Sequence, residues 1–211
     1  MNPRVLLCWT FITALAPWGV FAQDTPNEKV AKAQATIEKH LRDRAGSDAS
    51  VAAVGDKYLR DAFPNHVFVA VHFREWPIAR SAPAGLKHRN VFAVGQDGKI
   101  THFASAEVLL EFFKATPRIQ VQEEKTARAW LRLRMEFIQD GFFKFKYPEK
   151  IKPGPEASSV TILIGEVEVV PEAGNSGSLV ATFRFNQSGA LASISEENKV
   201  VRGQRPRVLR D

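Results

Sequence analysis

Cysteine is nearly absent from this sequence of 211 residues, because Cys8 is the only one. If Cys8 is removed with an N-terminal leader, the mature chain has no disulfide, thiolate metal site or cysteine nucleophile. The sequence also lacks a GxSxG nucleophile motif, a GxGxxG loop and a P-loop. These absences argue against the common hydrolase and nucleotide-binding classes. We therefore predict no catalytic residue and no cofactor.

The first 22 residues have the pattern of a secretory signal peptide. Arg4 precedes an uncharged run from Val5 to Gln23, and Ala22 provides the small residue of a cleavage site after Val20. An uncleaved membrane anchor is the alternative, because residues 5–22 are barely long enough to span a bilayer. We expect cleavage, a periplasmic or secreted protein, and no transmembrane segment in the mature chain.

The mature chain is mildly basic. The full sequence has a formal net charge of +6, and the loss of Arg4 lowers this charge to about +5. Such a charge permits contact with an anionic surface but does not require it. We expect no nucleic-acid ligand.

Apolar spacing and turn residues predict the elements of the first half. A linker is expected over residues 23–28. The predicted helices are Lys29–Arg44 and Ala49–Ala62, and the predicted strands are His66–Phe73, Asn90–Val94 and Lys99–Phe103. Gln96-Asp97-Gly98 supplies the turn of a tight hairpin between the last two strands.

The second half begins with two predicted helices and continues with strands. The helices are Ser105–Ala115, capped by Ser105, and Glu123–Asp140. The strands are Phe142–Tyr147, Ser159–Val170, Ser178–Phe185 and Ala190–Ser195, with a loop at Lys152–Glu156. Glu124, Arg128, Arg132 and Glu136 recur every four residues in the second helix, which predicts a solvated, charged helix face.

An ungapped shift of 91 positions aligns the two halves. It places Phe92 on Phe183 and Gly98 on Gly189, and it brings Val69, Val71 and Phe73 onto Val160, Ile162 and Ile164. We infer an α+β fold of two tandem units, residues 29–104 and 105–198, followed by a basic tail at 199–211. Each unit is expected to be helix, helix and antiparallel meander, with a helix covering one sheet face. The second unit carries extra residues at 141–158, which are expected to add a strand. One continuous sheet of six or seven strands is the alternative.

The order of helix and meander resembles that of cystatin-like units. Together with the closing hairpin pattern F-x-F-N-x-x-G-x-L, which begins at Phe183, it also resembles PepSY-type modules of exported bacterial proteins. The resemblance covers part of each half. It implies that the protein binds or inhibits other proteins.

All five histidines lie in the first half, which raises the question of a metal site. His66 and His72 share a strand face, but their separation of roughly 20 Å is too large for one ion. His72 could meet His102 across the sheet, and His40 and His88 lie elsewhere. We predict no metal site and expect the histidines to lie on a solvent face. Glu166 and Glu168 share a strand face as well, but an acid–base role for this pair has little support.

Two surface features are candidates for contact with a partner. Glu75 and Trp76 lie where a strand runs into a long loop, although Trp76 folded over the sheet edge is the more ordinary arrangement. The tail carries Arg202, Arg205, Arg207 and Arg210, which would suit an anionic surface or remain solvated. The expected partner is thus a protein or an anionic surface.

These features predict an exported, non-enzymatic binding or interaction protein of unknown ligand. The alternative is a small-ligand-binding or enzymatic domain with a pocket between helix and sheet. That pocket would be lined by residues such as Trp130, Phe137 and His72.

Overall fold

The computed structural model describes residues 25–45, 49–73, 86–87, 89–115, 123–139, 144–146, 149–155, 160–172 and 174–203. The predicted signal peptide at 1–22 lies outside these ranges. So do five of the candidate residues: Glu75, Trp76, Arg205, Arg207 and Arg210.

The described residues form four helices and eight strands. The helices are α1 (Pro26–Ala45), α2 (Lys57–Ala62), α3 (Ala106–Ala115) and α4 (Glu123–Ile138). The strands are β1 (Ala49–Ala53), β2 (His66–Phe73), β3 (Arg89–Gly95), β4 (Ile100–His102), β5 (Lys150–Pro153), β6 (Thr161–Glu168), β7 (Ser178–Phe185) and β8 (Leu191–Asn198).

The strands form two separate antiparallel sheets. The first sheet has the order β1-β2-β3-β4 and the second has the order β5-β6-β7-β8. This arrangement confirms the α+β class and contradicts the alternative of one continuous sheet. Strand β5 lies within the extra segment 141–158, as predicted.

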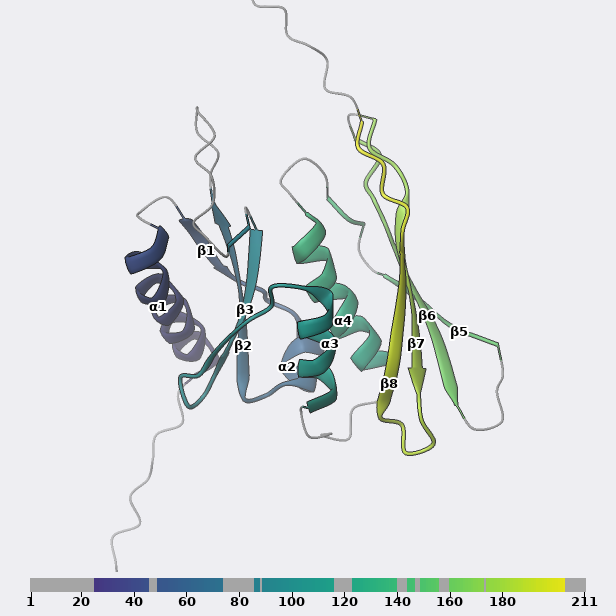
Figure 1. Ribbon diagram of the computed structural model, residues 1–211, viewed down its shortest axis with the longest axis horizontal. Coiled ribbons are helices and arrows are strands. Elements are labelled where there is room, and N and C mark those ends of the chain that lie inside the picture. Colours follow the sequence, from purple (N-terminus) through teal and green to yellow (C-terminus); the bar gives the residue numbers. More distant parts are fainter. Residues whose placement is uncertain are drawn as a thin grey trace, which may run out of the picture.

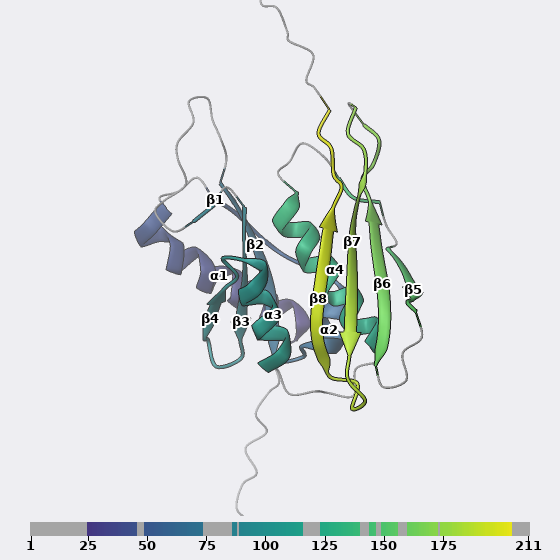
Figure 2. The same cartoon turned by 45° about the vertical axis from the view of Figure 1, so that its right-hand side comes forward.

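Helices and sheets alternate in four layers. Helix α1 covers one face of the first sheet, α2, α3 and α4 lie between the two sheets, and the second sheet closes the other side (Figure 1). The turned view shows the same order of layers (Figure 2). Two apolar cores follow from it. The smaller core joins α1 to the first sheet, and the larger one surrounds α4 between the sheets.

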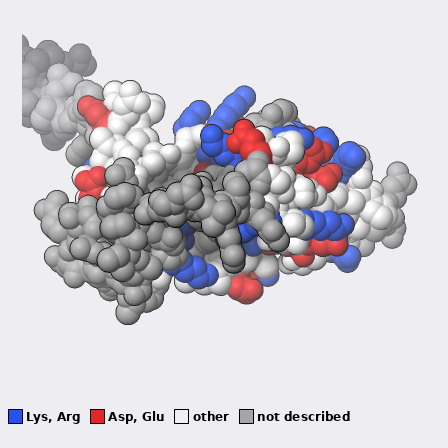
Figure 3. Space-filling model, turned by 90° about the horizontal axis from the view of Figure 1, so that it is seen from above, with Lys and Arg blue, Asp and Glu red and all other residues white. Residues whose placement is uncertain are grey.

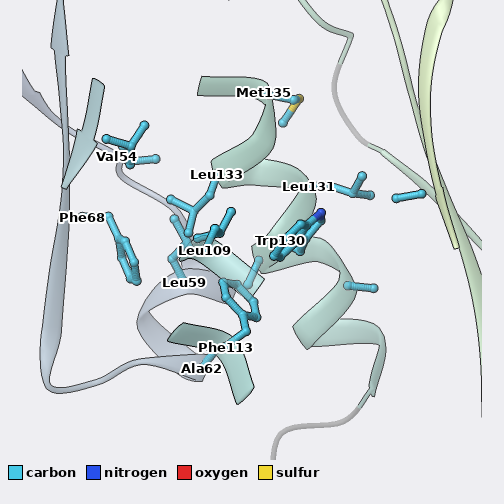
Figure 4. Packing of buried hydrophobic residues seen from close by; sticks show 14 of the residues in the cluster. Val54, Leu59, Ala62, Phe68, Leu109, Phe113, Trp130, Leu131, Leu133 and Met135 are labelled. Carbon is cyan, nitrogen blue, oxygen red and sulfur yellow. The ribbon is translucent and has the colours of Figure 1, made fainter. Parts of the chain in front are cut away.

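Helix α4 is buried on nearly all sides because it packs against both sheets. Leu133 lies on its side toward the first sheet and Leu131 on its side toward the second (Figure 4). Gly165 on β6 lets the helix approach closely, since a Cβ there would lie 2.6 Å from Leu131 Cδ1. Apolar residues on most sides of a helix are typical of such a central position.

Charged side chains of α4 tie it to both sheets. Glu136 is buried and pairs with Arg132 at 2.7 Å and with Arg89 of β3. Arg128 pairs with Glu124 at 2.7 Å and with buried Glu149, which precedes β5, at 2.8 Å. The predicted i,i+4 pairs are therefore present, but the expectation of a solvated helix face is wrong.

The first helix begins earlier than predicted. Thr25 and Glu28 form a capping box, in which Glu28 Oε2 accepts from the Thr25 backbone N–H at 2.6 Å. Pro26 occupies the first helical position, where its fixed φ suits a helix start. Residues 26–28 are therefore helical rather than part of a linker.

The predicted second helix is mostly a strand. Ala49–Ala53 pairs with β2 as the edge strand of the first sheet, and Val51 lies opposite Val71. Helix α2 begins only after Asp56, whose side chain accepts from the backbone N–H groups of Tyr58 and Leu59. Tertiary strand pairing has overridden the helical spacing.

Two predictions in the second half also need correction. Lys152 and Pro153 belong to β5 rather than to a loop, because β5 pairs with β6. Within the expected strand Phe142–Tyr147, the described residues 144–146 contain a single isolated bridge, Phe145 to Val169.

The two sheets share the same closing turn at the offset of 91 residues, although a β-bulge between Arg184 and Phe185 shifts the register of the second hairpin beyond its turn. Gly98 has φ of 79° and donates to Gly95 O at 2.9 Å, while Gly189 has φ of 68° and donates to Asn186 O at 2.7 Å. Phe92 faces α1 and Phe183 faces α4, so each lies beneath a helix. The equivalence of the two turns is confirmed.

The same offset fails for the preceding strands. Val69 pairs with Phe92, but Phe183 pairs with Leu163 rather than with Val160. This shift of three residues reverses the faces of β6, so Leu163 and Val167 pack against the core while Ile162 and Ile164 lie on the other face. The shift of 91 positions aligns Val160, Ile162 and Ile164 with Val69, Val71 and Phe73, which face α1, and predicts that they face a helix too. This expectation is wrong.

Candidate functional site

A pocket with a volume of about 370 Å³ lies between α1 and the first sheet, at the end where β2 begins and β3 ends. It is lined by Lys29, Lys32, Ala33 and Thr36 of α1, by Pro64, Asn65, His66 and Val67, and by Val94, Gly95, Gln96 and Gly98. Three separate segments of the chain thus converge on one hollow. Its volume lies within the range of small-molecule sites.

The packing of α1 explains why space remains there. Ala33, Ile37 and Leu41 recur every four residues and face the first sheet. Ile37 and Leu41 fill the gap above the sheet, whereas the short side chain of Ala33 does not reach as far. The capping box at Thr25 fixes the helix start, which places Lys29 and Lys32 beside Ala33 at the pocket.

The opposite wall is held by backbone hydrogen bonds. Gln96 N–H donates to Asn65 O at 3.0 Å and thereby joins the β3–β4 turn to the segment that precedes β2. Gly98 adopts positive φ and closes the turn on Gly95. A wall built from a tight turn and a strand end is preorganised for binding.

The pocket is apolar at its base and cationic at its rim. Ala33 and Val94 are buried, and Val67 is half-buried. Lys29 and Lys32 supply positive charge, while no Asp or Glu is among the described residues that line the pocket. The Asp97 carboxylate, in the adjoining turn, accepts from Lys99 N–H at 3.0 Å.

His66 contributes to the pocket but does not present a charged imidazole. Its ring packs edge-on against Phe63 and Phe112, on the sheet face opposite α1. Burial lowers the pKa of His66, and the Asp97 charge offsets this only in part. Because Nδ1 is buried without a hydrogen-bond partner, the neutral ring is favoured near neutral pH.

Two of the three residues expected to line a pocket, Trp130 and Phe137, belong to the core between the sheets instead. Trp130 is buried between the sheets, and its Nε1–H donates to Glu196 at 2.8 Å. Phe137 packs under the Arg134 guanidinium, and neither it nor His72 lines the pocket beside α1. A pocket between helix and sheet was thus expected, but its residues were predicted incorrectly.

Lys29 and Lys32 were not among the residues predicted to form a site. Their spacing of three residues beside Ala33, immediately after a Thr-Pro-x-Glu capping signal, was the available clue. Arg202 is the one predicted interaction residue among the described ranges; it is exposed near the Ser176–Val201 bridge and does not line the pocket.

The four histidines that the structure describes form no common cluster. His72 and His102 lie on opposite faces of the first sheet, because His72 pairs with Arg89 whereas His102 pairs with Phe92. His102 stacks on Phe92 and His40 lies edge-on to it, so these rings are half-buried rather than fully exposed. Within the described ranges, no group of three or more His, Cys, Asp or Glu side chains is placed to hold a metal ion.

The Glu166 and Glu168 strand face carries ion pairs. Glu168 pairs with Lys150 and with Lys146 Nζ at 3.0 Å. Hydrogen bonds from these two lysines lower the pKa of Glu168 to about 2. The carboxylate stays ionised near neutral pH and cannot act there as a proton donor.

Charge of both signs is spread over the described surface seen from above (Figure 3). None of the described helices is long and apolar enough to cross a membrane. Comparisons with protein-family models, curated proteins and solved structures found no match to this chain. Only the geometry of the pocket therefore supports its assignment as the candidate site.

Proposed function

We propose that this chain is an exported, non-enzymatic binding protein whose ligand occupies the pocket between α1 and the first sheet. The observation that supports this proposal is the pocket itself, which has an apolar base, a cationic rim and walls from three segments. Export is proposed from the N-terminal sequence pattern.

We further propose that the chain consists of two tandem cystatin-like units. In support, both sheets have four antiparallel strands in sequence order, and both closing hairpins use the same turn geometry. Helix α1 in the first unit and α4 in the second cover the faces that contain Phe92 and Phe183. The first unit keeps the pocket under its helix, whereas α4 is packed on both sides.

Native mass spectrometry of protein isolated under non-denaturing conditions tests the proposal. Wild-type protein should retain a small-molecule adduct that denaturation releases. Thr36→Trp should lose it, because the indole would fill the pocket that Thr36 lines. Ala35→Trp is the matched control, since Ala35 is exposed on α1 and does not line the pocket. Equal adducts in the two variants would contradict the pocket as the site.

A protein partner or an anionic surface remains a second proposal. It is supported by the sequence around Glu75 and Trp76 and by the arginines from Arg202 to Arg210. Pulldown with the mature protein, compared with a variant truncated after Val201, separates a tail-dependent partner from one that binds elsewhere.

A further inference from the structure

We propose that the pocket beside α1 takes an amphiphilic organic anion. Its carboxylate would lie between Lys29 and Lys32, and its apolar body would lie on Ala33, Val67 and Val94. This inference rests on the proposed binding function and names the chemical class of its ligand.

The charge of the lining favours an anion. Lys29 and Lys32 are three residues apart on α1, so their side chains project from the same side of the helix. Both line the pocket, and neither forms an ion pair with a described carboxylate. Two ammonium groups at the rim of a hollow with no acidic lining residue among those described would repel a cation and attract an anion.

The neighbouring carboxylates are already engaged. Glu28 Oε2 accepts from Thr25 N–H, and this hydrogen bond lowers the pKa of Glu28. The Asp97 carboxylate accepts from Lys99 N–H. Backbone donors thus position these two carboxylates in the capping box and in the turn. Both carboxylates stay charged, but neither forms a salt bridge with Lys29 or Lys32.

The base of the pocket favours an apolar body over a fully polar anion. Ala33 and Val94 expose 3% and 6% of their surface, and they belong to the apolar core beneath α1. The Thr36 hydroxyl donates to Lys32 O at 2.7 Å, so its proton is used within the helix. A ligand seated there meets the apolar residues Ala33, Val67 and Val94, the polar residues Asn65 and Gln96, and positive charge at the rim. This combination suits an amphiphile.

Calorimetric titration with octanoate, octanamide and octylamine tests the inference, because the three probes share one chain and differ in charge. Octanoate should bind the wild-type protein most tightly, by roughly three- to tenfold over octanamide, as expected for partly exposed ion pairs. Octylamine should bind most weakly. Equal affinities, tightest binding of octylamine or no binding of octanoate would overturn the inference.

Charge-removing variants identify the lysines responsible. Lys29→Gln with Lys32→Gln should weaken octanoate by roughly three- to tenfold and leave octanamide unchanged. The control is Lys39→Gln with Lys57→Gln, which removes the same charge from two exposed positions outside the pocket. Thermal melting of each variant verifies folding. An equal loss of octanoate affinity in both double variants would show that the net charge of the protein, and not these two lysines, causes the effect. That result would overturn the inference.

The two proposals fail in different ways. If octanamide or octylamine binds and Thr36→Trp abolishes that binding, the pocket is a ligand site but its ligand is not anionic. If the native protein carries no adduct, and no probe responds to Thr36→Trp, the binding function assigned to the pocket fails as well.

Discussion

Arg134 of α4 forms a bidentate ion pair with Glu196 of β8. Arg134 Nε lies 2.8 Å from Glu196 Oε1, and Arg134 Nη2 lies 2.8 Å from Oε2. Trp130 Nε1–H donates to the same Oε1 at 2.8 Å. This arrangement joins the central helix to the last strand of the second sheet, and both charged side chains are largely buried.

Replacement of Glu196 by alanine should destabilise the fold by about 1–3 kcal/mol, because it leaves Arg134 and the Trp130 N–H without their acceptor. Glu197→Ala is the control, since Glu197 is 65% exposed and pairs only with exposed Lys199. Urea unfolding measures both. Equal free energies of unfolding for the two variants would show that the Glu196 contacts contribute little.

A second prediction concerns the close approach of α4 to the second sheet. Gly165→Ala should cost about 1–3 kcal/mol, because its Cβ would lie 2.6 Å from Leu131 Cδ1 and 3.1 Å from Ile151 and Phe183. Gly55→Ala offers a matched control, since a Cβ at Gly55 meets no atom within 4 Å. Thermal denaturation should show a clearly lower melting temperature for Gly165→Ala and little change for Gly55→Ala.

The hairpin glycine Gly98 and the loop glycine Gly177 give a third prediction. Gly98→Val should cost about 1–3 kcal/mol from its positive φ, since its Cβ position is otherwise open. Gly177→Val should cost more, because φ is 94° and a Cβ would lie 2.0 Å from Lys199 O. From the sequence alone, the position of Gly177 in a loop predicts the reverse order, with a smaller cost at Gly177 than at Gly98. Chemical denaturation of both variants decides between the two orders.

The positions of most strands and their closing turns were the most predictable part of the fold. Strands β2, β3, β6 and β7 were evident from alternating apolar residues and turn glycines, which act locally. Strand β1 was not, because Ala49–Ala53 is extended only through its pairing with β2. The slip of β6 relative to β7 escaped prediction for a similar reason, since register depends on the length of the connecting loop.

The candidate site was less predictable than the fold. The sequence indicated a pocket between helix and sheet, but it could not show which helix would leave space. Trp130 has the size of a lining residue, yet α4 is enclosed by both sheets and Trp130 is buried in the core between them. The hollow forms beside the small Ala33 on α1 rather than beside a large aromatic residue.

The ion pairs of Glu168 make its titration a fourth prediction. The pKa of Glu168 is about 2 in the folded protein, against an ordinary value of 4.5. The ionised carboxylate therefore stabilises the fold at pH values above 4.5. This contribution disappears as the pH falls toward 2. In Lys150→Met the pKa of Glu168 should rise toward 4.5, and high salt should raise it in the wild type. Carboxyl-carbon NMR titration measures both, and an unchanged value in Lys150→Met would refute the pairing.

Amide NMR of the mature protein during octanoate titration shows most directly whether the hollow beneath α1 binds a ligand. We expect saturable shifts at Ala33, Val94 and Gly98, and their loss in Thr36→Trp but not in Ala35→Trp. Saturable shifts confined to residues outside this pocket, or shifts that persist unchanged in Thr36→Trp, would contradict this expectation.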